Sequence, residues 1–241
     1  MLEKFKYLIK HLLVSIFIVS LCLSLILLFW YPNPLYKATG VSEVFLLIFT
    51  LDVIIGPILG FIVYKKGKKS LKVDLSIIIG LQFIALSYGL YTLAQARPVW
   101  IVYYKDGFEL IQKNHIYIAD EEVKSIYKEQ SYFGPLYVSV SDATNAKHKN
   151  DDIIFEMSGL SVAQMPHRYT EFEASRKLRI QYAQDISHLV KFNSHSKIEK
   201  ILIAYPEAKY FYPLKSSFED MTILVDKNFN VIKIVDLRPW N

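Results

Sequence analysis

The chain has 241 residues, a single cysteine and a formal net charge of +5. The lone Cys22 excludes an intramolecular disulfide framework, so packing must hold any folded part together. The charge does not indicate a nucleic-acid partner, because residues 97–241 carry 19 basic and 19 acidic side chains. The excess comes from nine lysines and four acids in residues 1–96, where it is a signal of membrane topology.

Three apolar runs dominate the first 96 residues. Each is close to the ~20 residues that a helix needs to cross a bilayer, and we expect transmembrane helices at about 8–31, 43–64 and 75–96. The first run is too long for the apolar core of a cleaved signal peptide, and it ends in FWYPNP without a small-x-small site. We therefore expect it to be a retained anchor.

The loop KKGKKSLKVD, residues 65–74, carries five lysines between the second and third runs. Three more lysines precede the first run, at Lys4, Lys6 and Lys10. Short loops rich in lysine stay on the cytoplasmic side. We therefore predict a cytoplasmic N-terminus and lysine loop, and an extracytoplasmic domain over residues 97–241.

The second run contains the motif LDVIIGPILG. Asp52 falls near its middle, where an ionisable group costs about 2.5–3.5 kcal/mol on insertion scales and is usually functional or paired. Pro57 lacks a backbone donor and predicts a kink. Gly56 and Gly60 have the small-xxx-small spacing that lets another helix come close.

Two interpretations of this motif stay open. The first is a polar, kinked groove that receives a helix of a partner protein. The second is an internal seam, in which Asp52 bonds to Gln82 or Ser87 of the third run. The third helix is expected to open with Asp74 as its N-cap. Arg97, which follows that helix, either anchors in the lipid headgroups or has a structural role.

Residues 97–241 are predicted to form one α+β domain. The runs VWIVYY and FELI flank an Asp-Gly turn, and MTILV and VIKIV flank the turn DKNFN, so each pair predicts a β-hairpin. Further strands are expected at Leu136–Val140 and Ile153–Met157. The polar residues 141–152 between them are expected to form a loop.

Two helices are predicted in the same domain. The first begins with a capping box at Thr170 and Glu173, and apolar residues recur at helical spacing as far as Leu189. The second begins with a capping box at Ser196 and Glu199, and Pro206 ends it.

Signatures of catalysis are absent from the sequence. It has no Gly-rich phosphate loop, no G-x-S-x-G, no H-E-x-x-H and no C-x-x-C. The histidines of residues 97–241 lack the spacing of metal ligands. We therefore expect no catalytic residue, no cofactor and no metal, and we do not expect an enzyme.

Four stretches together resemble the type IV pilin accessory protein family, often called TfpX/TfpZ. They are LDVIIGPILG, KKGKKSLKVDLSIIIGLQ, YGLYTLAQARPVWIVYYKDGFEL and ILVDKNFNVIKIVDLRPW. The resemblance implies a bacterial inner-membrane protein with a periplasmic C-terminal domain. It also implies an accessory protein or chaperone that binds its cognate type IV pilin, major or minor, and modulates pilin stability and pilus assembly.

The positions matched by the family, together with the glycine spacing, are the candidate partner-binding residues: Asp52, Gly56, Pro57, Gly60, Arg97, Asp236 and Trp240. Membrane lipid is the other expected partner, and nucleic acid is not expected. The alternative function is a membrane-anchored sensor or assembly scaffold with an extracytoplasmic ligand-binding or partner-binding domain, which the same architecture would suit.

Overall fold

A computed structural model of the chain describes residues 1–118, 122–141, 143 and 146–240. The chain forms two compact units. We call Met1–Trp30 with Val41–Ala96 the helical unit, and Tyr31–Gly40 with Arg97–Asn241 the α+β unit. The predicted class of fold is confirmed, because three long apolar helices precede a mixed-sheet domain. Tyr31–Gly40, which connects the first two helical stretches, belongs to the α+β unit.

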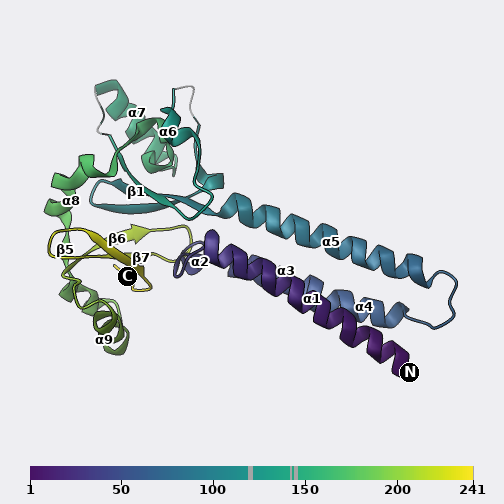
Figure 1. Ribbon diagram of the computed structural model, residues 1–241. Coiled ribbons are helices and arrows are strands. Elements are labelled where there is room, and N and C mark those ends of the chain that lie inside the picture. Colours follow the sequence, from purple (N-terminus) through teal and green to yellow (C-terminus); the bar gives the residue numbers. More distant parts are fainter. Residues whose placement is uncertain (119–121, 142, 144–145, 241) are drawn as a thin grey trace. The chain divides into compact units, whose positions relative to one another are not determined.

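The helical unit consists of three helical stretches that run beside one another (Figure 1). They are α1 (Leu2–Phe29), a middle stretch made of α3 (Ser42–Phe49), η1 (Thr50–Ile55) and α4 (Gly56–Val63), and α5 (Leu71–Ala96). Each stretch is long and apolar enough to cross a membrane. The middle stretch packs against both α1 and α5 and therefore connects the two other helices.

The start of α5 differs from the prediction. The helix begins at Leu71, and Asp74 lies in its first turn instead of at the N-cap. The Asp74 carboxylate accepts a 3.0 Å hydrogen bond from the Ser70 hydroxyl and forms a 2.6 Å ion pair with Lys68. An acid in the first turn still complements the positive end of the helix dipole, which explains why the helix extends one turn earlier.

In the α+β unit, eight strands of the described residues form one mixed sheet in the order β4-β3-β1-β2-β6-β7-β8, with β5 paired to β6. Both predicted hairpins are present, β1 with β2 and β7 with β8, and so is the strand predicted at Leu136–Val140. The strands are β1 (Pro98–Tyr104), β2 (Gly107–Gln112), β3 (Leu136–Val140), β4 (Tyr169–Thr170), β5 (Gln184–Asp185), β6 (Tyr210–Lys215), β7 (Met221–Val225) and β8 (Val231–Val235).

Strand β1 is buried on both faces, because its side chains alternate between two apolar clusters. Ile101 and Tyr103 pack with Phe108 in one cluster, and Trp100 and Val102 pack in the other. Helix α2 (Leu35–Ala38) adds Leu35 and Ala38 to the first of these clusters. The segment between α1 and α3 is therefore part of the core of the α+β unit.

The prediction of a strand at Ile153–Met157 is wrong. These residues form the second half of helix α7 (Ala146–Met157). The run IIFEM is too short for its periodicity to tell a strand from a helix. The helix also replaces most of the loop predicted over residues 141–152, of which residues 142 and 144–145 lie outside the described part.

The first predicted helix is also shorter than expected. Thr170 lies in β4 and makes no cap, and a 3₁₀ turn η5 (Phe172–Ser175) leads into α8 (Arg176–Tyr182). Strand β5 and the 3₁₀ segment η6 (Ile186–Lys191) follow. The apolar residues at helical spacing, which extend as far as Leu189, therefore continue past the end of helix α8.

The second predicted helix is present as α9 (His195–Ala204), but Ser194 precedes it, without a side-chain cap. The remaining short elements are η2 (Lys113–His115), α6 (Ser125–Lys128), η3 (Val162–Gln164) and η4 (Pro166–Arg168).

Candidate functional site

The middle helical stretch changes to a π-helix at the motif that the sequence singled out. Residues Thr50–Ile55 are π-helical, and the Gly56 N–H donates to the carbonyl of Leu51, five residues earlier. In a regular α-helix the Pro57 ring would meet the carbonyl four residues before it and leave that carbonyl without a donor. The wider π turn just before Pro57 accommodates this residue where the sequence predicted a kink. Such segments are frequent at functional sites.

Asp52 lies within this π segment and is buried, with 4% of its surface exposed. The Gln82 amide of α5 donates a 2.9 Å hydrogen bond to the backbone carbonyl of Asp52. Its carboxylate, by contrast, has a buried Oδ2 atom without a hydrogen-bond partner among the described residues. The internal seam predicted between Asp52 and Gln82 therefore exists, but it uses the backbone and leaves the charged group unsatisfied.

A chain of hydrogen bonds extends from Gln82 to α1. The Gln82 carbonyl lies 2.9 Å from Nε2 of His11, and the Tyr7 hydroxyl lies 3.2 Å from Nδ1 of the same ring. Because an amide oxygen only accepts, His11 must carry its proton on Nε2, and Nδ1 of the neutral ring accepts from Tyr7. These polar groups satisfy one another, whereas Oδ2 of Asp52 has no such partner among the described residues.

The carboxylate faces a groove of about 480 Å³ between α1 and α5. The walls are apolar, and the polar atoms come from a few side chains near the floor, chiefly Asp52, Gln82, His11 and Ser15. The apolar wall residues are Val14, Ile18, Val19 and Cys22 of α1 and Ile79, Phe83, Leu86 and Leu90 of α5. An apolar groove with one buried acid is suited to an apolar segment that brings a positive charge or a hydrogen-bond donor.

The two glycines of the motif do not line this groove. A Cβ atom at Gly56 would lie 2.0 Å from Nε2 of Gln82, and one at Gly60 would lie 2.9 Å from the Tyr7 ring. Both glycines therefore allow this chain's own α1 and α5 to come close. Among the four residues predicted in the middle stretch, Asp52 alone lines the groove in the described structure.

Arg97 is 6% exposed, so its side chain is not presented to lipid headgroups. Its guanidinium lies over the ring of Tyr132, 5.5 Å from the centroid. Burial raises the pKa of Tyr31, and the charge of Arg97 acts in the opposite direction. Both observations place Arg97 in a structural role beside two tyrosines of the α+β unit, in agreement with the second of its two interpretations.

The C-terminal motif DLRPW is held by contacts within the chain. Asp236 forms a 2.8 Å ion pair with Lys37 and a second ion pair with Arg238. Arg238 also pairs with Glu219 at 3.2 Å. The Trp240 indole donates a 2.7 Å hydrogen bond to Asp220. The predicted partner-binding residues Asp236 and Trp240 therefore close the α+β unit and fasten the Lys37 segment to it.

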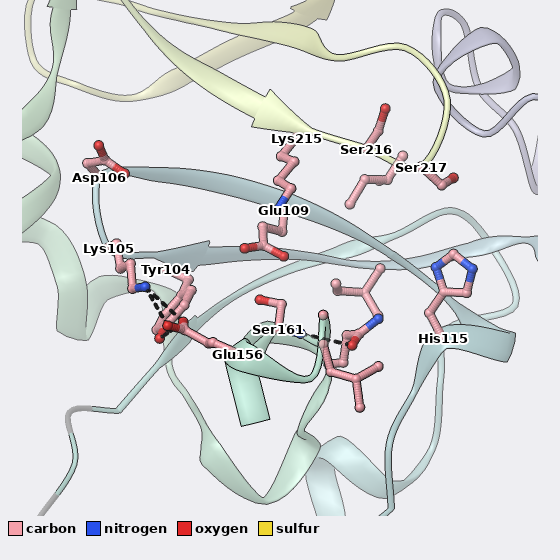
Figure 2. A pocket seen from close by; sticks show the side chains of 15 residues that line it. Tyr104, Lys105, Asp106, Glu109, His115, Glu156, Ser161, Lys215, Ser216 and Ser217 are labelled. Atoms are coloured by element: carbon pink, nitrogen blue, oxygen red, sulfur yellow. Dashed lines mark hydrogen bonds and ion pairs between the residues drawn. The ribbon is translucent and has the colours of Figure 1, made fainter. Parts of the chain in front are cut away.

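A second hollow, of about 570 Å³, lies in the α+β unit, and Figure 2 shows side chains that line it. Its lining carries three acids, Asp106, Glu109 and Glu156, and two lysines, Lys105 and Lys215. Glu156 accepts a 2.6 Å hydrogen bond from the Tyr104 hydroxyl and pairs with Lys105 at 2.8 Å. Burial raises the pKa of Glu109, and a hydrogen bond from Ser161 opposes that shift. This polar pocket could hold a small polar ligand or a loop of another protein.

His115 and the serines Ser161, Ser216 and Ser217 also line the polar pocket. Burial lowers the pKa of His115, but within the described residues this imidazole makes no side-chain hydrogen bond to the serines of the pocket. The described part of the chain also contains no group of three or more His, Cys, Asp or Glu that could hold a metal ion.

Comparison with known proteins identifies relatives along nearly the whole chain. It is 33% identical over 243 residues to the fimbrial assembly protein, serogroup I, of Dichelobacter nodosus, and the match covers 94% of this chain and 92% of that protein. It is 34% identical over 241 residues, with the same coverage, to the serogroup E1 protein of that organism. No family model and no solved structure matches the chain.

The chain belongs to the fimbrial assembly protein family. This membership confirms the predicted resemblance, and it spans both the helical unit and the α+β unit. A third family member, for serogroups C1 and C2, is 38% identical over 113 residues, which are 46% of this chain and 86% of that protein.

One residue of the site in this fimbrial assembly family member was not anticipated from the sequence. His11 was overlooked because it lies at the basic end of the first apolar run, among lysines. A signal was present, since Tyr7 and His11 are four residues apart and therefore share one helix face. Two polar side chains on one face of an apolar helix indicate that this face packs against protein.

Proposed function

We propose that this family member is an inner-membrane accessory protein that binds the apolar helix of its cognate type IV pilin in the groove between α1 and α5. The observation that carries the proposal is the buried Asp52 carboxylate, which lines an apolar groove without a partner among the described residues. An unpaired carboxylate at this depth is costly, and a bound cationic or donor group would relieve that cost.

The proposed occupant follows from the chemistry of the groove and from the family. The relatives are named fimbrial assembly proteins. Type IV pilins, as the family context implies, wait in the membrane as one apolar helix with a charged N-terminus. Such a helix would lay its apolar side against the walls and offer its amine to Asp52. The α+β unit would shield the pilin head until assembly, so that pilin stability and supply are modulated without chemistry on the pilin.

The proposal includes an orientation. Eight lysines lie at the N-terminus and in the Lys65–Lys72 loop, and we place both segments in the cytoplasm. The α+β unit then lies in the periplasm, on the side where a pilin head would be. We further propose that the protein is not an enzyme, because within the described residues Glu156 of the polar pocket is paired with Lys105 and His115 makes no hydrogen bond to a serine of the pocket.

The decisive variant is Asp52→Asn, which keeps the size of the side chain and removes its charge. If Asp52 pairs with the pilin, steady-state pilin and surface piliation fall about tenfold, in line with losing one buried charge pair. Both are measured by immunoblot and by shearing pili from cells. Glu43→Gln is the matched control, because Glu43 is an exposed acid of the same helical stretch. Unchanged pilin and piliation in Asp52→Asn would remove Asp52 from the mechanism.

A photo-crosslinker tests the groove directly and separates a binding defect from misfolding. Placed at Phe83, which lines the groove, it is expected to capture pilin. Placed at Ile84, which is 64% exposed and is not among the groove residues, the crosslinker is not expected to capture pilin. Equal capture at both positions would contradict a groove-specific complex.

The second candidate function is that of a membrane-anchored sensor or assembly scaffold. The polar pocket favours it, because a hollow of this size with polar walls could receive a small ligand or a loop of an envelope protein. Crosslinked pull-down distinguishes the two candidates. Pilin as the main captured protein supports the first, and envelope proteins without pilin support the second.

A further inference from the structure

Two adjacent aromatic side chains stand out on the surface of the α+β unit. Tyr132 is 72% exposed and Phe133 is 74% exposed. They lie on the turn formed by residues 131–135, which we call the aromatic loop. The Phe133 N–H donates a 3.0 Å hydrogen bond to the Ser131 hydroxyl, and Gly134 has a φ of +71° that suits glycine. The loop therefore has a defined shape that presents both rings outward.

One contact and one close approach place the aromatic loop beside chain segments next to the apolar helices. The Arg97 guanidinium lies over the Tyr132 ring, and Arg97 directly follows Ala96, the last residue of α5. A Cβ atom at Gly134 would lie 3.9 Å from the ring of Pro32, which closely follows the end of α1 at Phe29. Along the chain, Arg97 is one residue from the end of α5 and Pro32 is three residues from the end of α1, so both residues beside the loop are close in sequence to helices long enough to cross a membrane.

The chemistry of the loop fits that depth. Helix ends of apolar spans lie at the boundary between hydrocarbon and headgroups, where aromatic side chains are enriched. Leu136, directly after the loop, is also 49% exposed. The exposed residues that precede the loop carry both signs, Lys124 and Lys128 with Glu122 and Glu129. The aromatic rings, and not a net positive charge, are therefore the feature that a lipid surface would recognise.

We propose that the aromatic loop inserts Tyr132 and Phe133 into the headgroup layer of the leaflet from which α5 emerges. The occupant of this surface is phospholipid. The buried Arg97 then acts as a positioning residue, because its stacking on Tyr132 links the loop to the end of α5. The proposal does not depend on pilin binding, since it concerns the protein and its bilayer alone.

The test uses the full chain in nanodiscs, in a Cys22→Ser background that leaves no other thiol. Phe133→Cys carries an environment-sensitive fluorophore, and the lipids carry a spin-label quencher just below the headgroup. Ile203→Cys is the matched control, because Ile203 on α9 has the same exposed fraction of 74%. We expect the label at residue 133 to be quenched about twofold or more relative to the label at residue 203, as for an interfacial ring. Zwitterionic and anionic lipids should give the same result.

A second label position keeps the proposal falsifiable if Phe133→Cys distorts the turn. Tyr132→Cys should be quenched in the same way. Quenching at residues 132 and 133 that does not exceed that at residue 203 overturns the proposal. A change in the label that requires added pilin, without quenching by lipid, also overturns it and assigns the loop to the pilin head instead.

Discussion

Lys37 and Asp236 are 199 positions apart in the sequence and form a 2.8 Å ion pair. Burial alone would raise the pKa of Asp236, but the hydrogen bond from Lys37 and the charge of Arg238 outweigh it and lower that pKa. The same hydrogen bond raises the pKa of Lys37. The lowered carboxyl pKa contributes stability above about pH 4 that is lost as the pH falls further. The raised amine pKa contributes stability below about pH 10 that is lost as the pH rises further.

Asp236→Asn should therefore destabilise the full chain more than Lys37→Met. The asparagine removes the carboxylate that Lys37 and Arg238 share, although Arg238 keeps its pair with Glu219, and we expect a loss of about 1–3 kcal/mol in the free energy of unfolding. Lys37→Met removes one partly exposed partner, which is worth about 1 kcal/mol or less. Thermal unfolding in detergent at pH 7 and pH 3 measures both. Lys233→Met, an exposed lysine on β8, is the control. A deficit in Asp236→Asn that persists unchanged at pH 3 would contradict the assignment.

The residue scale also separates what the sequence could predict from what it could not. Asp52 could be singled out because one acid inside an apolar run is conspicuous in the sequence, and the structure places it in the lining of the groove. Asp236 and Trp240 were singled out as well, yet their partners are Lys37 and Asp220, which the fold alone brings near them. Gly56 and Gly60 had the right spacing, but spacing cannot say whether the helix that approaches belongs to this chain or to a partner.

At the scale of elements, the contact of α5 with α3 depends on one glycine. A Cβ atom at Gly89 would lie 2.5 Å from Cγ1 of Ile48, so Gly89→Ala forces this pair of helices apart. Overpacking of this kind costs about 1–3 kcal/mol. Gly80 on the same helix has nothing within 4 Å of its Cβ position, so Gly80→Ala should be neutral or slightly stabilising. Thermal unfolding of the two variants in detergent, with their levels in the membrane, checks this contrast. Equal behaviour of both variants would refute the packing of α5 on α3.

The elements that the sequence missed have local explanations. Strand β6 contains Pro213, which argues against a central strand because it cannot donate to a ladder. In the structure Pro213 falls between two short pairings on one side of β6. Tyr210 and Phe211 pair with β5, and Leu214 and Lys215 pair with β2. The long apolar helices were predicted well because length and hydropathy define them. A position in a strand where no neighbouring strand needs a backbone donor, such as that of Pro213, can be recognised only when the pairing of the strands is known.

At the scale of the whole molecule, the chain passes between its two units three times, at residues 30–31, 40–41 and 96–97. The segment Tyr31–Gly40 is both a connection between two apolar helices and a part of the α+β core, through Leu35, Ala38 and Lys37. Residues 97–241 alone therefore do not contain the complete core. This interdependence suits a protein whose membrane groove and outer domain act on one partner.

The orientation of the molecule is the last prediction, and it tests every role proposed for the groove and the α+β unit. Alkaline phosphatase, which is active only outside the cytoplasm, is fused after Asn241 in one fusion and after Lys66 in another. The first fusion should be active and the second inactive, because short loops rich in lysine stay on the cytoplasmic side. A fluorescent protein that matures only in the cytoplasm should give the reverse pattern. Activity of phosphatase at Lys66 and not at Asn241 would place the α+β unit away from any pilin head. The proposed accessory function would then fail, even though the groove with Asp52 would be unchanged.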